Sequence, residues 1–283
     1  MTAPIIRNLA ELRAKTTEWS RAGEVIGVVP TMGALHAGHL SLAAAARSAC
    51  DRVIVTIFVN PKQFNNPEDL ANYPRTEHDD AEKLAPLDVD VIYVPDPDQI
   101  YPEGFATNVS VSGLTDVMEG EFRPGHFDGV STVVAKLFLQ TAADRAYFGQ
   151  KDYQQLMLVT RMARDLDIPT QVVGCPTVRE PSGLAMSSRN LRLSEEGLVK
   201  AARLNPIMQQ VADQLAQGAE FTTLAAQTRS QLEAAGFYDI EYFDLRCATS
   251  LAALETPTRP ARMLAAAWMD GVRLIDNIAV PAL

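Results

Sequence analysis

Two histidines separated by two residues stand in the segment PTMGALHAGH, directly after a short apolar run. The Ala- and Leu-rich stretch that follows predicts a helix over 40–50, so His36 and His39 come just before its first turns. A helix N-terminus offers unpaired N–H groups and partial positive charge, which suit a phosphate. Gly33 and Gly38 let a ligand approach the backbone, and imidazoles donate hydrogen bonds as phosphoryl charge builds. The alternative is a turn carrying two exposed histidines.

Amide side chains follow the second apolar run, 53–59. Asn60 and Gln63 lie in the segment FVNPKQF, at the expected carboxyl end of a strand. Amides there can hold a polar substrate by directional hydrogen bonds. An Asn-Pro turn with a solvated glutamine would account for the same residues.

Two later segments carry cations and hydroxyls suited to a polyphosphate. Lys151 in FGQKDYQQ is a candidate phosphate cation, and Asp152 either caps the next helix or accepts a ribose hydroxyl. The segment REPSGLAMSSRN places Ser187, Ser188 and Arg189 in a glycine-bearing loop that can wrap a triphosphate. A serine-rich linker is the plainer interpretation of that loop.

Charged residues elsewhere allow further contacts. Arg123 in the loop RPGHFDGV can pair with a phosphate or a carboxylate, whereas His126 is expected to order that loop. Nine acids crowd residues 77–103, and a solvated face explains most of them. Asp79 and Asp80 are candidates to help place Mg²⁺ carried by a nucleotide, because this ion usually takes only one or two carboxylates.

The elements that must position these residues alternate along the first part of the chain. Continuous apolar strands separated by helices indicate a parallel sheet covered on both faces, with ligands at the carboxyl ends of strands. The predicted fold class is therefore α/β, a Rossmann-like parallel sheet with helices on both faces. Strands are predicted over 24–29, 53–59, 89–94, 145–148 and 170–175, and helices over 40–50, 129–142 and 152–166.

The pattern changes after Pro176. Helices are predicted over 194–217 and 221–235, followed by a strand over 238–245 and two strands within 263–280 joined at Asp270-Gly271. This order indicates a smaller α+β domain. The sequence thus predicts a nucleotide-binding domain over 1–177 and a C-terminal domain over 178–283.

Composition narrows the class of protein. The 283 residues are 47% hydrophobic and 21% charged, with a net charge of −10, which excludes a disordered chain. The excess acid disfavours nucleic acid and anionic lipid as partners. The three cysteines form no CxxC pair, and no apolar h-region or membrane-length stretch is visible. A reduced, cytoplasmic enzyme is expected.

Taken in order, these motifs resemble the pantoate–β-alanine ligase (pantothenate synthetase) family, within the superfamily of HxGH adenylyl-transferring enzymes. The resemblance rests on PTMGALHAGH, FVNPKQF, YPRT, RPGHFDGV, FGQKDYQQ, REPSGLAMSSRN and the closing RLIDNI, and so covers nearly the whole chain. Arg192 departs from the family, in which an aromatic residue often follows SSRN.

The resemblance implies a two-step reaction: pantoate attacks the α-phosphate of ATP to give pantoyl adenylate and pyrophosphate, and β-alanine then displaces AMP to give pantothenate. It also implies a cytoplasmic, Mg²⁺-dependent homodimer. The second loop or the small domain is expected to close over ATP.

Site residues follow from the matched motifs. The residues expected to take part in catalysis are His39, His36, Lys151 and Arg189. Those expected at ATP are Met32, Gly33, Ala34, Leu35, His36, Ala37, Gly38, His39, Gly149, Gln150, Lys151, Asp152, Val178, Met186, Ser187, Ser188 and Arg189. Those expected at pantoate or β-alanine are Gln63, Gln155, Asn60 and Arg123.

Three other functions fit parts of the pattern. A nucleotidyltransferase acting on a phosphate group would need a basic second pocket, where this chain offers Asn60, Gln63 and Gln155. A fragment of an aminoacyl-tRNA synthetase would need RNA contacts that the acidic charge disfavours. A nucleotide-sensing regulatory protein would bind ATP without releasing pyrophosphate.

Overall fold

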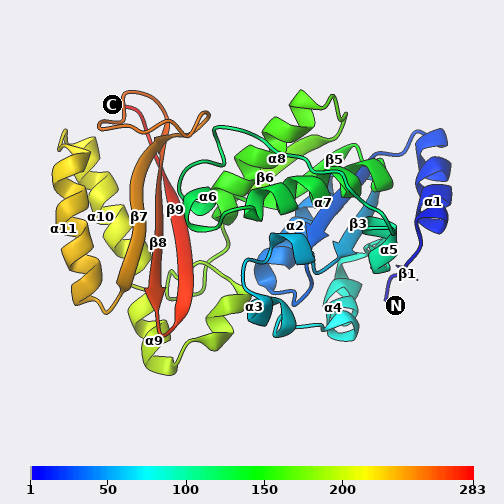
Figure 1. Ribbon diagram of the computed structural model, residues 1–283, viewed down its shortest axis with the longest axis horizontal. Helices are drawn as coiled ribbons and strands as arrows, with labels where there is room; N and C mark the ends of the chain where they lie inside the picture. Colours follow the sequence, from blue (N-terminus) through cyan, green and yellow to red (C-terminus); the bar gives the residue numbers. More distant parts are fainter. Residues whose placement is uncertain (1) are drawn as a thin grey trace. The chain divides into compact units, whose positions relative to one another are not determined.

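The computed structural model describes residues 2–283, which form two compact units (Figure 1). The N-terminal unit comprises the chain up to Gln150 together with Gln155–Pro176. The C-terminal unit comprises Thr177–Leu283 and the short segment Lys151–Gln154. The sequence predicts a single boundary at 177, whereas the structure groups Lys151–Gln154 with the second unit.

A parallel sheet organises the N-terminal unit, as the α/β class requires. Within residues 2–283, this sheet pairs six strands in parallel, and β2 lies between β3 and β5. In spatial order the strands are β1 (Ile5–Ile6), β4 (Val91–Tyr93), β3 (Arg52–Ile57), β2 (Ile26–Thr31), β5 (Arg145–Gly149) and β6 (Gln171–Cys175). The predicted parallel sheet is confirmed.

Helices cover both faces of this sheet. The α-helices are α1 (Leu9–Arg21), α2 (Ala37–Ala49), α3 (Pro67–Ala71), α4 (Glu77–Leu84), α5 (Pro97–Ile100), α6 (Glu119–Phe122), α7 (His126–Thr141) and α8 (Tyr153–Asp165). Single 3₁₀ turns are η1 (Pro61–Gln63), η2 (Ala85–Leu87) and η3 (Gln150–Asp152). Helices α1 and α7 contact each other, and α2 packs with α4 and η2 over a core that includes Val29, Val55 and Leu84.

Strand order reverses beside β2, and this places the histidine segment. From β2 the chain leads to β3 on one side, and later returns to β5 on the other. Open parallel sheets bind ligands outside the carboxyl ends of their strands at such a switch point. The segment between β2 and α2 begins at this point.

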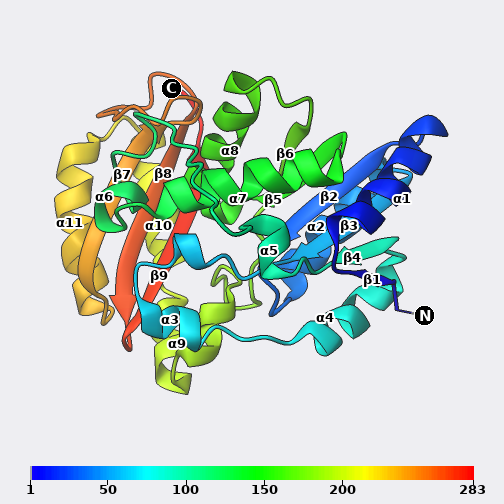
Figure 2. The same cartoon turned by 45° about the vertical axis from the view of Figure 1, so that its right-hand side comes forward.

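An antiparallel sheet of β7 (Tyr238–Cys247), β8 (Ala261–Met269) and β9 (Val272–Val280) forms the C-terminal unit with its helices. Helix α10 packs on β9 and α11 on β7, as Figure 2 shows for α11. The helical elements are η4 (Ser188–Arg192), α9 (Glu195–Ala201), α10 (Leu204–Ala216) and α11 (Phe221–Ala234). Asp270 and Gly271 have φ of +50° and +74°, as a tight hairpin of type I′ requires, so the predicted hairpin is confirmed.

One expected helix is divided. The sequence predicts a continuous helix over 194–217, but α9 ends at Ala201 and α10 begins at Leu204. Pro206 explains the break, because proline has no N–H to bond the carbonyl four residues earlier and is tolerated in a first turn.

The cysteines and the helix lengths were both considered in the sequence, and the structure describes each of them. Cys50, Cys175 and Cys247 are buried and unpaired with one another. Across residues 2–283, no helix combines the length and the apolar character needed to cross a bilayer.

Candidate active site

The two histidines cap the first turn of α2. The Nδ1 atom of His36 accepts the N–H of Gly38 at 3.1 Å, and the Nδ1 atom of His39 accepts the N–H of His36 at 3.3 Å. Because each Nδ1 is an acceptor, a neutral ring carries its proton on Nε2. The ring centroids lie 4.1 Å apart, so two Nε2–H donors come from one helix terminus. This arrangement suits an anionic phosphoryl oxygen.

Asp80 holds the turn before these histidines. Its fully buried carboxylate accepts the backbone N–H groups of Ala34 and Leu35 at 2.9 and 2.7 Å, and the Thr76 hydroxyl at 3.1 Å. Gly33 and Ala34 have φ of +83° and +52°, a region that an alanine enters only at a cost of about 1–2 kcal/mol. Two charge-assisted bonds at this point offset that strain.

A buried asparagine orients the candidate substrate amide. Asn60, only 1% exposed, donates from Nδ2 to the Oε1 atom of Gln63 and to the carbonyl of Gly129, each at 3.0 Å. Its Oδ1 accepts the hydroxyl of Tyr101 at 2.7 Å. Since the Gln63 oxygen is taken by a donor, the Gln63 NH₂ group is the end that can donate to a substrate. Asn60 therefore orients Gln63, and the direct substrate contact expected of Asn60 from sequence stays a prediction.

Close packing keeps this amide pair against α7. A Cβ atom on Gly129 would lie 2.3 Å from the carbonyl oxygen of Lys62, so only glycine allows α7 to approach η1 this closely. The carbonyl of Gln63 accepts Nδ1–H of His126 at 2.8 Å, and Arg123 donates to the other ring nitrogen of His126 at 3.2 Å. Arg123 thus braces the Gln63 segment, and the substrate contact predicted for Arg123 from sequence stays a prediction.

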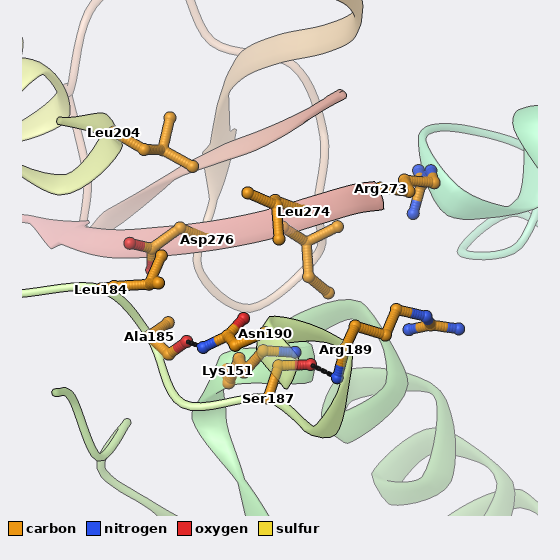
Figure 3. Close-up of a pocket in the computed structure, with 11 residues that line it drawn as sticks. Lys151, Leu184, Ala185, Ser187, Arg189, Asn190, Leu204, Arg273, Leu274 and Asp276 are labelled. Carbon is orange, nitrogen blue, oxygen red and sulfur yellow. Dashed lines mark hydrogen bonds between the residues drawn. The ribbon is translucent and has the colours of Figure 1, made fainter. Parts of the chain in front are cut away.

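A pocket in the C-terminal unit brings together three further candidates, Lys151, Ser187 and Arg189. Figure 3 shows Lys151, Ser187 and Arg189 on one side of this pocket, with Leu274 and Asp276 of β9 on the other. Lys151 is 16% exposed, and its ammonium lies 3.6 Å from the carboxylate of Asp152. The pocket thus brings cations from two predicted motifs together, as a polyphosphate site needs.

Hydrogen bonds from side chains and from the backbone shape the loop that carries Arg189. Ser187 accepts the N–H of Arg189 at 3.2 Å and caps η4, and buried Asn190 donates to the carbonyl of Ala185 at 3.0 Å. The N–H of Met186 bonds the carbonyl of Val178 at 3.0 Å. The loop is a structured hairpin turn and not the plain serine-rich linker considered from sequence.

The other predicted residues have simple placements. Gln155 is half-buried on α8, and Met32, Ala37 and Gly38 line the turn into α2. Gly149 ends β5 and Gln150 begins η3. Asp79 is exposed on α4, away from the buried position of Asp80. Among residues 2–283, no group of three histidine, cysteine or acidic side chains could hold a metal ion.

Comparison with known proteins identifies the family. The profile of the family described as pantoate-beta-alanine ligase matches residues 4–279. The chain belongs to the pantoate–β-alanine ligase family. Its sequence is 77% identical to pantothenate synthetase of Ruegeria pomeroyi over 283 residues, covering 100% of this chain and 99% of the relative. It is 68% identical to pantothenate synthetase of Ruegeria sp. strain TM1040 over 280 residues, covering 99% of this chain and 100% of the relative.

Solved structures of the family share the fold over the whole chain. Pantothenate synthetase of Thermus thermophilus is 43% identical, with a TM-score of 0.91, covering 98% of this chain and 99% of that one. The Francisella tularensis pantoate-beta-alanine ligase, solved with beta-gamma ATP and beta-alanine, is 37% identical, with a TM-score of 0.82 and coverage of 98% and 97%.

Sequence reasoning missed what holds the family's motifs in place. Asp80 bonds a turn 45 and 46 residues away, and Arg179 bonds Asp276, 97 residues away. Both residues stand inside or beside motifs quoted from the sequence, but a local pattern does not report a distant partner. The signal that the sequence offers is Asp80 directly after Asp79, in a helix next to YPRT, but this pair predicts a contact with Mg²⁺ and not a bond to a distant turn.

Proposed function

We propose that the chain condenses pantoate with β-alanine at the expense of ATP. A carboxylate oxygen of pantoate attacks the α-phosphorus, the bond to the β-phosphate oxygen breaks, and pyrophosphate leaves. The amine of β-alanine then attacks the acyl carbon, and AMP leaves with the bridging oxygen. Activation is needed because a carboxylate is a poor acyl donor to an amine. The product, pantothenate, assigns the chain to pantothenate biosynthesis and so to the supply of coenzyme A.

The histidine cap of α2 is the observation that carries this proposal. His36 and His39 accept backbone N–H groups on Nδ1 and so carry Nε2–H donors beside a helix N-terminus. Donors fixed before the reaction stabilise charge on phosphoryl oxygens without reorganising during it. We assign His39 the larger share in adenylation and His36 a supporting contact with the phosphates.

Gln63 is proposed to bind pantoate. Asn60 holds its Oε1 atom at 3.0 Å, so the NH₂ group donates to the substrate. The amide segment lies beyond β3, next to β2 in the sheet, and hence beyond the strand end neighbouring the histidine turn. Gln155 is the second proposed pantoate ligand. A neutral amide pair suits a hydroxy acid better than the basic pocket that a phosphate acceptor would require.

The pocket of the C-terminal unit is proposed to bind ATP phosphates. Lys151, Arg189 and Ser187 line this pocket and would supply two charges and a hydroxyl. Ser188 and Asp152, next to these residues in the chain, are proposed to add a hydroxyl and to accept a ribose hydroxyl. Closure of residues 182–190 over the nucleotide is expected to exclude water, so that the adenylate meets the amine and is not hydrolysed. Hydrogen exchange across 182–190 should slow when pantoyl adenylate binds, and equal exchange with and without it would contradict closure.

Mg²⁺ is proposed to enter with ATP, bound through its phosphates. Asp80 does not fit a resident ion, because both its oxygens accept backbone N–H groups in a fully buried position. Asp79, exposed on the same helix, is proposed as an outer contact through water.

The chain is also proposed to act as a cytoplasmic homodimer, as the family resemblance implies. Sedimentation at micromolar concentration tests the dimer, and a monomer would contradict it.

A two-stage assay tests the function. Pyrophosphate should appear when ATP and pantoate are mixed with the protein, and amide should form only after β-alanine is added. Release that requires a phosphorylated acceptor would indicate a nucleotidyltransferase, and ATP binding without any release would indicate a regulatory protein. Either result would overturn the proposal.

A further inference from the structure

Two adjacent polar residues of the closing strand β9 are buried and have no role in the reaction proposed above. Asp276 and Asn277 are 4% and 3% exposed, inside the sequence RLIDNI. Neighbouring residues on a strand face opposite sides of the sheet. Asp276 shares its side with the core residues Leu274 and Ile278, so Asn277 lies on the other side. Burial of two polar side chains needs partners, and each has them.

Asp276 ties β9 to the loop that carries Arg189. Its carboxylate receives both terminal nitrogens of Arg179, at 2.7 and 2.9 Å. Arg179 also donates to the carbonyl of Gly183 at 3.0 Å, and its backbone pairs with Ala185 in an antiparallel bridge. A bidentate pair at a side chain only 3% exposed fixes direction as well as distance. Through Arg179, Asp276 therefore sets the start of the loop that continues to Arg189.

Asn277 ties the same strand to the backbone of Lys151. Its Nδ2 donates to the Lys151 carbonyl at 2.7 Å, and its Oδ1 accepts from Arg262 at 2.9 Å. Because Arg262 can only donate, it fixes which end of the amide faces Lys151. The Arg262 guanidinium also lies 4.1 Å from the ring centre of Tyr153, and the Tyr153 hydroxyl bonds the carbonyl of Ala248 at 2.8 Å. The segment from 151 to 153 is thus held at the Lys151 backbone and at the Tyr153 side chain.

We propose that Asp276 and Asn277 are positioning residues that fix the spacing between the Lys151 segment and the Arg189 loop. Asp276 holds the Arg189 loop and Asn277 holds the Lys151 segment, so Lys151 and Arg189 are both positioned relative to the backbone of β9. Figure 3 shows Lys151, Arg189 and Asp276 around the pocket. Misplacement of a positioned group by about 1 Å can reduce a rate by about a hundredfold. This inference rests on the proposed function, since it assigns the pocket to ATP.

The test replaces Asn277 without changing its size. In Asn277→Asp, the carboxylate still accepts from Arg262 but cannot donate to the Lys151 carbonyl. We expect kcat for pyrophosphate release to fall by about tenfold to a hundredfold, with KM for pantoate changed less than threefold. Asp276→Asn should behave similarly. Asp244→Asn is the matched control, because Asp244 pairs with Arg246 on β7 of the same sheet and bonds neither pocket segment.

The readout separates positioning from folding. Melting temperature and circular dichroism identify the variants that fold. If Asn277→Asp does not fold, Arg179→Lys replaces it in the test, because lysine keeps the positive charge but cannot make the bidentate pair with Asp276. A folded variant with kcat and ATP KM within twofold of wild type overturns the inference, as does an equal loss in Asp244→Asn. If wild type releases no pyrophosphate, the proposed function fails. In that case, ATP binding is measured by calorimetry on the wild type and the variants, and still tests the positioning role. An ATP affinity unchanged in Asn277→Asp and Asp276→Asn overturns that role. An affinity weakened in these two variants and not in Asp244→Asn supports it.

Discussion

At the scale of single residues, the site is defined by which atom of each side chain is already engaged. His39 and His36 use Nδ1 on the backbone, Gln63 uses Oε1 on Asn60, and Asp80 uses both oxygens on backbone N–H groups. An atom that accepts a hydrogen bond fixes which other atom of a histidine or glutamine side chain carries the donor hydrogen. Residue type and spacing predicted the histidines and Gln63, but only the structure shows that Asn60 supports Gln63.

Replacing His39 should affect the first step. We expect His39→Ala to lower kcat for adenylation by about a hundredfold or more, the loss typical of removing one such donor. It also removes one half of the α2 capping box, so unfolding free energy should fall by about 1 kcal/mol. Single-turnover pyrophosphate release measures the rate and urea titration the stability. His78→Ala is the control, since its side chain is 86% exposed. An unchanged single-turnover rate would remove His39 from the mechanism.

Replacing Gln63 should affect pantoate selectively. Gln63→Ala removes the NH₂ donor that Asn60 orients, so KM for pantoate should rise about tenfold or more, the loss expected for a bond to a charged group. KM for ATP should change little. Initial rates with each substrate varied measure both values, and exposed Gln227→Ala on α11 is the control. Equal effects on the two substrates would contradict the assignment.

At the scale of elements, periodicity predicted most of the fold, and the exceptions have physical causes. The β-branched runs of β2, β3 and β4 stood out, whereas β1 is only two residues long. Helix α1 buries only Leu12, Thr16 and Trp19 among polar neighbours, and so gave a weak pattern. The bonds from Asp80 to Ala34 and from Asn277 to Lys151 span 46 and 126 residues. No local pattern contains such pairings, which is why the residues that hold the site were missed.

Asp80 on helix α4 should be essential for the stability of the turn before α2. In Asp80→Asn an NH₂ group replaces one acceptor of the backbone N–H groups of Ala34 and Leu35, so the turn before α2 loses a bond and a charge. We expect a loss of about 2–4 kcal/mol in unfolding free energy and a fall in kcat for pyrophosphate release. Glu82→Gln, 63% exposed on the same helix, is the control. Wild-type stability in Asp80→Asn would show that the clamp is unimportant.

At the scale of the whole chain, the charge of −10 gives little information about the site. ATP and pantoate are anions, yet the cations proposed to bind ATP, Lys151 and Arg189, are gathered in one pocket of an acidic protein. The helix terminus at His36 adds partial positive charge that no residue count includes. Local placement therefore decides binding, and the net charge sets only the surrounding potential.

Stability of the chain should decline at alkaline pH. Burial is the main cause that raises the pKa values of Tyr93, Tyr101 and Tyr147 to about 12, above the ordinary value of 10. Between pH 10 and 12 the unfolded chain therefore loses these protons first, and folding becomes less favourable as pH rises. Urea midpoints from pH 9 to 12 measure this decline. Tyr93→Phe should have a shallower decline, and identical slopes would contradict the role of Tyr93.

The central claim is that pantoate is activated as an adenylate, and the fate of its oxygen tests this most directly. Pantoate labelled with ¹⁸O in both carboxylate oxygens should react with ATP and β-alanine to give AMP carrying one ¹⁸O atom, detected by mass spectrometry. The bridging oxygen leaves with AMP when the amine attacks the acyl carbon, so pyrophosphate should carry no label. Label in inorganic phosphate with formation of ADP, or unlabelled AMP, would contradict the account.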